Sequence, residues 1–214
     1  MKSIASNKRI IIRRCTLSVM LLGMLICLLF CCFPRVSAGA QGEYGKTMYT
    51  SLTARPSENG RLTASGTDLV DSEGNAVQLR GVSTHGLAWY PDYINNSLFK
   101  EVSADWNCNL IRLAMYSELY CDGEKKENLK LMKKGIDAAI KADMYVLVDW
   151  HILADDDPNI NVDEVIEFFD MIAEEYKDSP NLLFEICNEP NGTTNWGDVL
   201  KYSNKFIPVI RKHI

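Results

Sequence analysis

A carboxylate and an amide stand side by side where an apolar segment of the sequence ends. Residues 182–187 read Leu-Leu-Phe-Glu-Ile-Cys, and Asn188, Glu189 and Pro190 follow directly. A carboxyl group held at the mouth of a buried strand can transfer a proton, and the neighbouring amide can orient a polar substrate by hydrogen bonding. The segment therefore indicates acid–base chemistry at a strand end.

Three earlier strand-like segments, at 78–83, 109–115 and 145–150, also lead into residues that can do chemistry. In parallel α/β folds the carboxyl ends of the strands meet at one edge, where functional groups collect. We therefore expect one rim to gather Glu189 with the residues at these other strand ends. Those residues are His85, Trp89, Tyr90, Arg112, Tyr116, Asp149 and His151.

Several of these residues also have a purely structural interpretation. Arg112 lies inside an apolar strand, where a guanidinium needs an acidic partner. Asp149 can serve only to brace His151 or a backbone amide. Glu185 faces the same side as Glu189 but lies roughly 13 Å deeper, which predicts an ion pair and not a catalytic pair. Residues 155–157, three consecutive aspartates, are typical of a solvated loop.

The elements that must position these groups alternate regularly along the chain. Apolar residues recur at helical spacing between and after the strand-like segments, which predicts helices at 95–106, 127–142, 163–176 and 196–211. Four strand–helix pairs indicate right-handed βαβ units and a parallel sheet. Both a doubly wound sheet and a (β/α)8 barrel use this order, but no glycine-rich phosphate loop follows the first strand. A small β-hairpin is predicted at 69–79.

Four segments in this order resemble glycoside hydrolase family 5, and specifically its bacterial endoglucanases. They are RGVSTHGLAWYP at 80–91, DWNCNLIRLAMY at 105–116, VLVDWHILADDDPN at 146–159 and LLFEICNEPNG at 182–192. The resemblance covers about residues 65–213. It implies an α/β fold of the (β/α)8 TIM-barrel type, of which this sequence holds about four βα units, a half-barrel preceded by the small hairpin.

The resemblance also implies an activity, the retaining endo-hydrolysis of β-1,4-glucosidic bonds in cellulose or related β-glucans. It makes Glu189 the general acid/base, Asn188 the amide that bonds the sugar 2-hydroxyl, and Arg112 the residue that keeps the nucleophile ionised. Neither a metal nor an organic cofactor is implied, and the expected partner is a β-glucan polysaccharide or cello-oligosaccharide. Substrate contacts are implied for His85, Trp89, Tyr90, Tyr116 and His151, and His151 is also implied to be one of the catalytic residues.

The sequence departs from the family in one respect. The family's nucleophile is a second glutamate near the end of strand seven, whereas this sequence ends at Ile214, after the fourth unit. We therefore expect the chain alone to be catalytically weak or inactive, and to self-associate through exposed barrel edges. The alternatives are a non-catalytic carbohydrate-binding or self-associating half-barrel, and a mannan- or xyloglucan-active member of the same family.

The charge and the cysteine content of the chain argue against several classes of binding partner and site. The chain holds 23 Lys and Arg residues against 28 Asp and Glu, and six of the basic residues lie before residue 39, where no acid occurs. The remainder is markedly acidic, which argues against nucleic acid or anionic lipid as a partner. Three cysteines, Cys108, Cys121 and Cys187, follow residue 38, and their number and wide spacing predict neither a disulfide scaffold nor a zinc site.

The first residues are typical of a targeting segment. A basic start precedes the apolar run 15–33, and small residues at 36–40 fit a signal-peptidase site. We predict a signal peptide at 1–38 and a secreted protein. The alternative is an uncleaved membrane anchor formed by 15–33, since a span needs about 18 apolar residues. Residues 39–62 are predicted to form a linker or leader, and 63–214 the catalytic domain.

Overall fold

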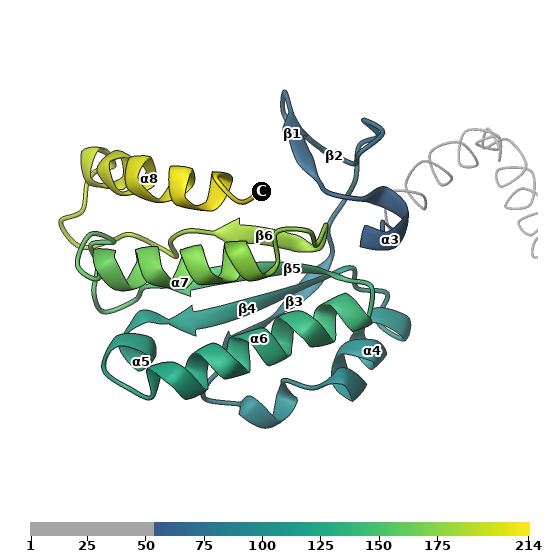
Figure 1. Cartoon of the computed structure of the whole chain (residues 1–214), viewed down its shortest axis with the longest axis horizontal. Helices are drawn as coiled ribbons and strands as arrows, with labels where there is room; N and C mark the ends of the chain where they lie inside the picture. The colour runs from purple at the N-terminus through teal and green to yellow at the C-terminus, as the bar shows by residue number, and fades with distance from the viewer. Residues whose placement is uncertain (1–53) are drawn as a thin grey trace, which may run out of the picture. The chain divides into compact units, whose positions relative to one another are not determined.

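The computed structural model describes residues 54–214. The predicted signal segment 1–38 and the first part of the predicted leader lie outside the described residues. Four parallel strands form one sheet in the order β3–β4–β5–β6 (Figure 1). Their bounds are Gly81–Gly86, Leu110–Tyr116, Tyr145–His151 and Leu182–Glu185. The predicted alternation of strands and helices is confirmed.

Each strand is followed by a helix. The long helices are α4 (Asn96–Ala104), α6 (Lys125–Lys141), α7 (Val162–Glu175) and α8 (Trp196–Arg211). The side chain of Asn95 caps α4 by accepting a hydrogen bond from the Leu98 N–H, and Asn195 begins α8 with a capping box. Two short elements carry too few residues to show a period in the sequence, α5 (Ser117–Cys121) and the 3-10 helix η1 (Pro91–Tyr93).

The helices cover one face of the sheet, which we call the helix face. Figure 1 shows α6 and α7 lying across it. Every second residue of β5 points into this layer, and Val146, Val148 and Trp150 are fully buried there. They pack in one cluster with Phe168 and Phe169 of α7, as the alternation of side chains along a strand requires.

Among residues 54–214, the segment that packs on the opposite side of the sheet, which we call the inner face, lies at the end where the strands begin. The segment that covers it contains α3 (Pro56–Asn59) and the antiparallel pair β1 (Thr63–Ser65) and β2 (Asp68–Val70). Ala54, Leu62 and Tyr145 form a second, smaller apolar cluster there. This cluster leaves the other end of the inner face, at the strand ends, free for polar groups.

Two boundaries differ from the sequence predictions. Residues 54–62, assigned above to a leader, pack against the body, and Arg55 donates hydrogen bonds to the carbonyl oxygens of Ser103 and Cys108. The hairpin predicted at 69–79 is present in a short form, since an antiparallel bridge joins Val70 to Ala76 and the N–H of Val77 donates to the carbonyl of Leu69, but a further pair, β1 with β2 at 63–70, precedes it. None of the helices within residues 54–214 is long and apolar enough to cross a membrane.

Candidate active site

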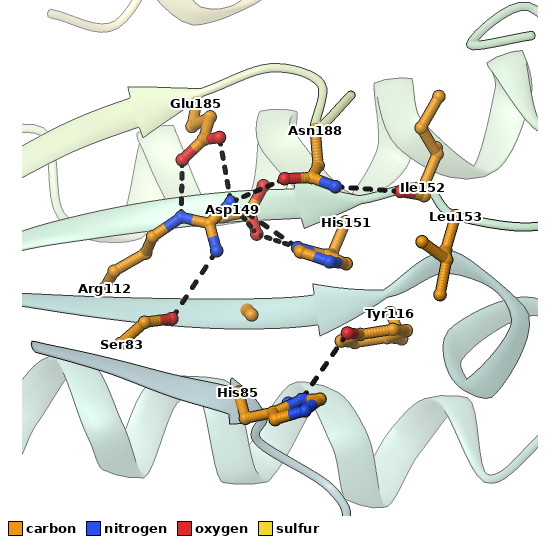
Figure 2. Close-up of polar contacts among 12 residues, drawn as sticks. Ser83, His85, Arg112, Tyr116, Asp149, His151, Ile152, Leu153, Glu185 and Asn188 are labelled. Atoms are coloured by element: carbon orange, nitrogen blue, oxygen red, sulfur yellow. Dashed lines mark hydrogen bonds and ion pairs between the residues drawn. The ribbon is translucent and has the colours of Figure 1, made fainter. Parts of the chain in front are cut away.

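Arg112 lies at the centre of a polar cluster on the inner face (Figure 2). Its Nε and Nη2 donate to the two carboxylate oxygens of Glu185 at 2.7 and 2.8 Å, which is a bidentate ion pair. Nη2 also donates to Oδ1 of Asn188 at 3.0 Å. Nη1 has only a long contact, 3.5 Å, to Oγ of Ser83. The hydrogen bonds to Glu185 raise the pKa of Arg112 above its ordinary value, so the guanidinium is permanently charged.

Asp149 lies beneath this cluster and is completely buried. Its Oδ2 is 2.8 Å from Nη2 of Arg112 and 2.7 Å from Nδ1 of His151, whereas its Oδ1 has no hydrogen-bond partner. Burial raises the pKa of Asp149 to about 8; the carboxylate of Glu185 adds to this shift and Arg112 opposes it. The expectation that Asp149 braces His151 is met, and Asp149 also faces the guanidinium.

Asn188 and Glu189 follow the end of β6. The regular pairing of β6 with β5 stops at Glu185, but the backbone N–H of Asn188 still donates to the carbonyl of Trp150. The buried amide of Asn188 is held at both ends, since its Oδ1 accepts from Arg112 and its Nδ2 donates to the carbonyl of Ile152 at 3.1 Å. The side chain next to Glu189 is therefore rigidly oriented.

Glu189 itself is exposed and has a backbone φ of 22°. Positive φ is uncommon outside glycine, and such strain collects at functional sites. Glu189 lies within electrostatic reach of His151 and Tyr116. Burial lowers the pKa of His151 and Arg112 adds to the effect, whereas the charges of Glu185 and Glu189 oppose it. Burial raises the pKa of Tyr116, and Asp149 and Glu189 contribute in the same direction.

The aromatic residues form a row along the rim. His151 stacks on Tyr116 with ring centroids 4.2 Å apart, and Tyr116 lies 4.4 Å from Trp89. The row continues from Trp89 to His85 at 5.0 Å and from His85 to Tyr90 at 6.4 Å. Trp89 and Tyr90 are 43% and 51% exposed, so their faces are open to a ligand. This row offers the broad apolar surface that a sugar ring binds.

The backbone at the end of β3 positions His85 and Trp89 of the aromatic row. His85 has a φ of 57°, and the pairing of β3 with β4 shifts register between Ser83 and Gly86. The N–H of Gly86 donates to Nδ1 of His85 at 2.9 Å, which leaves Nε2 to carry the proton of a neutral ring. A Cβ at Gly86 would lie 2.8 Å from the Trp89 ring, so the glycine permits the close approach.

Most of the predicted residues come together as expected, although no direct contact fixes Glu189 to the others. The predicted ion pair of Glu185 is present, and its side chain is 29% exposed. Two participants were not singled out from the sequence. They are Ser83, which contacts Arg112, and Tyr93, whose ring lies 6.3 Å from that of Tyr90. Strand alternation with His85 signals Ser83, but no pattern signals Tyr93.

The acidic loop after β5 is held by its own hydrogen bonds. Asp155 accepts from the N–H of Leu153, and Asp157 accepts from the N–H and the amide of Asn159. Within residues 54–214 no group of three or more histidine, cysteine or acidic side chains is arranged to hold a metal ion. Cys108, Cys121 and Cys187 are free.

Comparison with known proteins places this geometry in a family. The sequence model of the cellulase family, glycosyl hydrolase family 5, matches residues 70–213. Endoglucanase A of Butyrivibrio fibrisolvens is 46% identical over 158 residues, which cover 71% of this chain and 37% of that protein. The endoglucanase of Clostridium saccharobutylicum is 42% identical over 170 residues, covering 78% of this chain and 38% of that protein.

Solved structures give the same result. The catalytic domain of Thermobifida fusca endoglucanase Cel5A superposes with a TM-score of 0.70 and 39% sequence identity. The match covers 75% of this chain and 53% of that one. The chain thus spans less than half the length of these two curated relatives and about half of the solved domain. The parallel sheet with its helices is part of a (β/α)8 barrel, which confirms the predicted fold class.

Proposed function

The chain belongs to the cellulase family, glycosyl hydrolase family 5, and we propose that it carries the acid–base part of an endoglucanase site. In this proposal the site cleaves β-1,4-glucosidic bonds within a glucan chain, with retention at the anomeric carbon. Glu189 protonates the leaving oxygen, and a second carboxylate attacks the anomeric carbon. The curated relatives are named endoglucanases, which supports a β-glucan substrate.

One observation carries the proposal: the amide of Asn188, next to Glu189, is bonded directly to Arg112. This bond fixes the residue next to the proton donor to a permanently charged guanidinium. Glu185, Asp149 and Asn188 engage Nε and Nη2 of Arg112, whereas Nη1 makes only the 3.5 Å contact with Ser83. We assign Nη1 to the attacking carboxylate, which a charge-assisted hydrogen bond keeps ionised.

The aromatic row supplies the sugar-binding surface in this scheme. Trp89 and Tyr90 are exposed at one end of it, and the imidazole of His151, whose pKa the charge of Glu189 influences, lies at the other. Glucosyl units bind along the row through the apolar faces of their rings, and the polar edges of Tyr116, His85 and His151 reach the sugar hydroxyls. Binding along several units fits attack inside a chain.

The test measures substrate binding and substrate hydrolysis separately. A retaining reaction needs a second carboxylate, and the resemblance assigns none within this sequence, so binding can occur without hydrolysis. The full chain is titrated with cellotetraose by calorimetry and assayed on soluble β-1,4-glucan and on β-mannan. Wherever hydrolysis occurs, Glu189→Gln should lower its rate by about 10²- to 10⁴-fold, because it removes the proton donor. Glu101→Gln, an exposed glutamate on α4, is the matched control and should leave the rate unchanged.

The combination of binding and hydrolysis that is observed decides between the proposed function and its alternatives. Binding with hydrolysis that depends on Glu189 supports the proposal. Binding without hydrolysis is the result expected of a site whose attacking carboxylate is not assigned within this sequence, and faster cleavage of mannan would reassign the sugar. If neither binding nor hydrolysis occurs, the proposal is wrong for this chain.

Two expectations from the sequence stay proposals. Secretion rests on residues 1–38, and detection of the protein in the medium with an N-terminus near residue 39 checks it. Self-association rests on the sheet edges, since among the described residues β3 pairs only with β4 and β6 only with β5. Analytical ultracentrifugation checks it, and a monomer at micromolar concentration would contradict it.

A further inference from the structure

The hydrogen bond between Asp149 and His151 lies directly beneath the proposed sugar-binding row. Nδ1 of His151 is 2.7 Å from Oδ2 of Asp149, and the ring stacks on Tyr116. Within the described residues Nε2 of His151 makes no hydrogen bond, so it is the ring nitrogen left for a ligand. Whether the pair holds one proton more than an ionised carboxylate beside a neutral ring decides whether Nε2 donates or accepts.

The charges around this pair do not balance. Arg112 brings one positive charge, whereas Asp149 and Glu185 bring two carboxylates. Asp149 is completely buried and Arg112 is largely buried, so a net negative charge here is costly. One additional proton makes the cluster neutral, and Asp149 and His151 are the groups placed to share it.

We propose that Asp149 is a positioning residue that shares one proton with His151 and thereby presents the Nε2–H of His151 to the cleft as a hydrogen-bond donor. A protonated Asp149 donates from Oδ2 to Nδ1, and the neutral ring then carries its hydrogen on Nε2. If the proton moves to the ring, Nε2–H is also present. The donor selects an acceptor oxygen on the sugar. This inference rests on the proposed function, because it concerns the same cleft.

The titration of the surroundings agrees with this assignment. Burial raises the pKa of Asp149 to about 8, so this carboxyl holds a proton at neutral pH, and burial lowers the pKa of His151, so the ring is uncharged. Above pH 8, Asp149 ionises and accepts from Nδ1–H, and Nε2 becomes an acceptor. The charged or titratable groups that face the pair are Arg112 and Tyr116 on β4, Glu185 and Glu189 on and after β6, and His85 on β3.

The test reads the tautomer of His151 directly by 15N NMR of the full chain. The chain has only three histidines, His85, His151 and His213, so single substitutions assign their signals. At about pH 7 the wild type should show a protonated Nε2 on His151, and at about pH 9.5 an unprotonated one, on either side of the pKa of about 8. An unprotonated Nε2 at about pH 7 would overturn the proposal, with no variant needed.

Asp149→Asn sharpens the test. An amide oxygen facing Arg112 can only accept from Nδ1–H, because an amide NH₂ in its place would meet the guanidinium. The variant should therefore show an unprotonated Nε2 at both pH values. A protonated Nε2 in this variant at about pH 7, or a tautomer that still changes near pH 8, would contradict the role of Asp149.

A second histidine–carboxylate pair supplies the matched control. Nε2 of His213, just after α8, is 2.8 Å from Oδ1 of Asp170 on α7, which is 42% exposed, and its Nδ1 is 2.6 Å from Oε2 of Glu174. Asp170→Asn should alter only the signals of His213 and leave the switch at His151 intact. If the switch at His151 is lost as well, the effect of Asp149→Asn is not specific and the proposal is overturned.

Binding separates this inference from the proposed function. Cellotetraose should bind the wild type about tenfold more weakly at about pH 9.5 than at about pH 7, as one hydrogen bond of about 1.4 kcal/mol requires. Asp149→Asn should lose this difference and Asp170→Asn should keep it. If cellotetraose does not bind although the tautomer switches, the proposed function is wrong and the role of Asp149 stands. If it binds with no switch, the role of Asp149 is wrong.

Discussion

The two faces of the β3–β6 sheet are built from alternate residues of the same strands, yet they are held in place by different forces. On the helix face Val146, Val148 and Trp150 of β5 are fully buried against α7. On the inner face of the same strand, Asp149 and His151 are fixed by a hydrogen bond and by the charge of Arg112. Burial of apolar area is non-directional, whereas hydrogen bonds to a guanidinium set the orientation of each partner.

The difference indicates which face supplies most of the folding stability and which face sets the orientation of the polar side chains. The helix face holds most of the large buried side chains, and substitutions there should change the free energy of unfolding. The inner face includes a buried carboxylate oxygen without a partner, on Asp149, which stability alone does not favour. We expect substitutions on the inner face to change protonation and orientation as well as the free energy of unfolding.

The largest expected effect lies on the helix face. Phe168→Ala removes a fully buried ring that contacts Trp150 and Tyr120, both with centroids 5.4 Å away. The transfer and cavity terms together should lower the free energy of unfolding by about 3 to 5 kcal/mol. Urea unfolding followed by circular dichroism measures this loss. Ile160→Ala, at a side chain that is 61% exposed, is the control and should stay within about 0.5 kcal/mol.

The second effect concerns the ion pair on the inner face. Arg112→Met leaves the carboxylates of Asp149 and Glu185 without their cation, and should cost about 3 kcal/mol. Adding Glu185→Gln should recover part of this loss, because it removes one of the two unpaired charges. A double-mutant cycle in urea measures the coupling.

An exposed ion pair provides the comparison. Lys177 and Glu174 are 2.9 Å apart on the surface, and Lys177→Met should leave the free energy of unfolding nearly unchanged. If Arg112→Met and Lys177→Met lower the free energy of unfolding equally, the inner-face ion pair is no more protected from solvent than a surface pair. That result would remove the distinction between the two faces.

The helix face could be predicted well from the sequence because its signal is local. Val165, Phe168, Phe169 and Ile172 recur at helical spacing and all are buried in α7. The same periodicity located α4, α6 and α8 to within a few residues. Apolar spacing reports burial directly, so the pattern of one segment suffices without knowledge of its neighbours.

The inner face could be predicted only in part, since its contacts join distant segments. The sequence indicated that Arg112 and Glu185 each need a partner, but not that they bind each other across 73 residues. Nor does any local pattern show that Arg55 of the predicted leader reaches Ser103 and Cys108. The positive φ at His85 also escapes such analysis, because it depends on the register shift between two strands.

The third effect is a decline of stability with rising pH that Asp149 on the inner face should cause. The folded-state pKa of Asp149, about 8, lies above the value of about 3.9 for an unfolded chain. Between these values the folded state binds more protons, so this group lowers stability as pH rises from about 4 to about 8. Asp149→Asn should remove that decline, as measured by urea midpoints across this range. An unchanged decline would assign it to other groups.

The smallest expected effect tests the aromatic row, where the inner face meets solvent. Gly86→Ala places a Cβ 2.8 Å from the ring of Trp89, so the ring must move from its position beside Tyr116. Because Trp89 is 43% exposed and can swing outward, the stability cost should be only about 1 kcal/mol. Near-ultraviolet circular dichroism and tryptophan fluorescence should change, and cellotetraose affinity should fall with them.

Gly66→Ala is the control for a substitution that costs stability without a steric contact. Its Cβ meets nothing within 4 Å, so the loss of stability comes from the strained φ of 63° and the tryptophan signals should stay unchanged. If Gly86→Ala changes stability without changing the tryptophan signals, Trp89 is not held by the close approach to Gly86. The orientation of the row would then depend on Tyr116 and His85 alone.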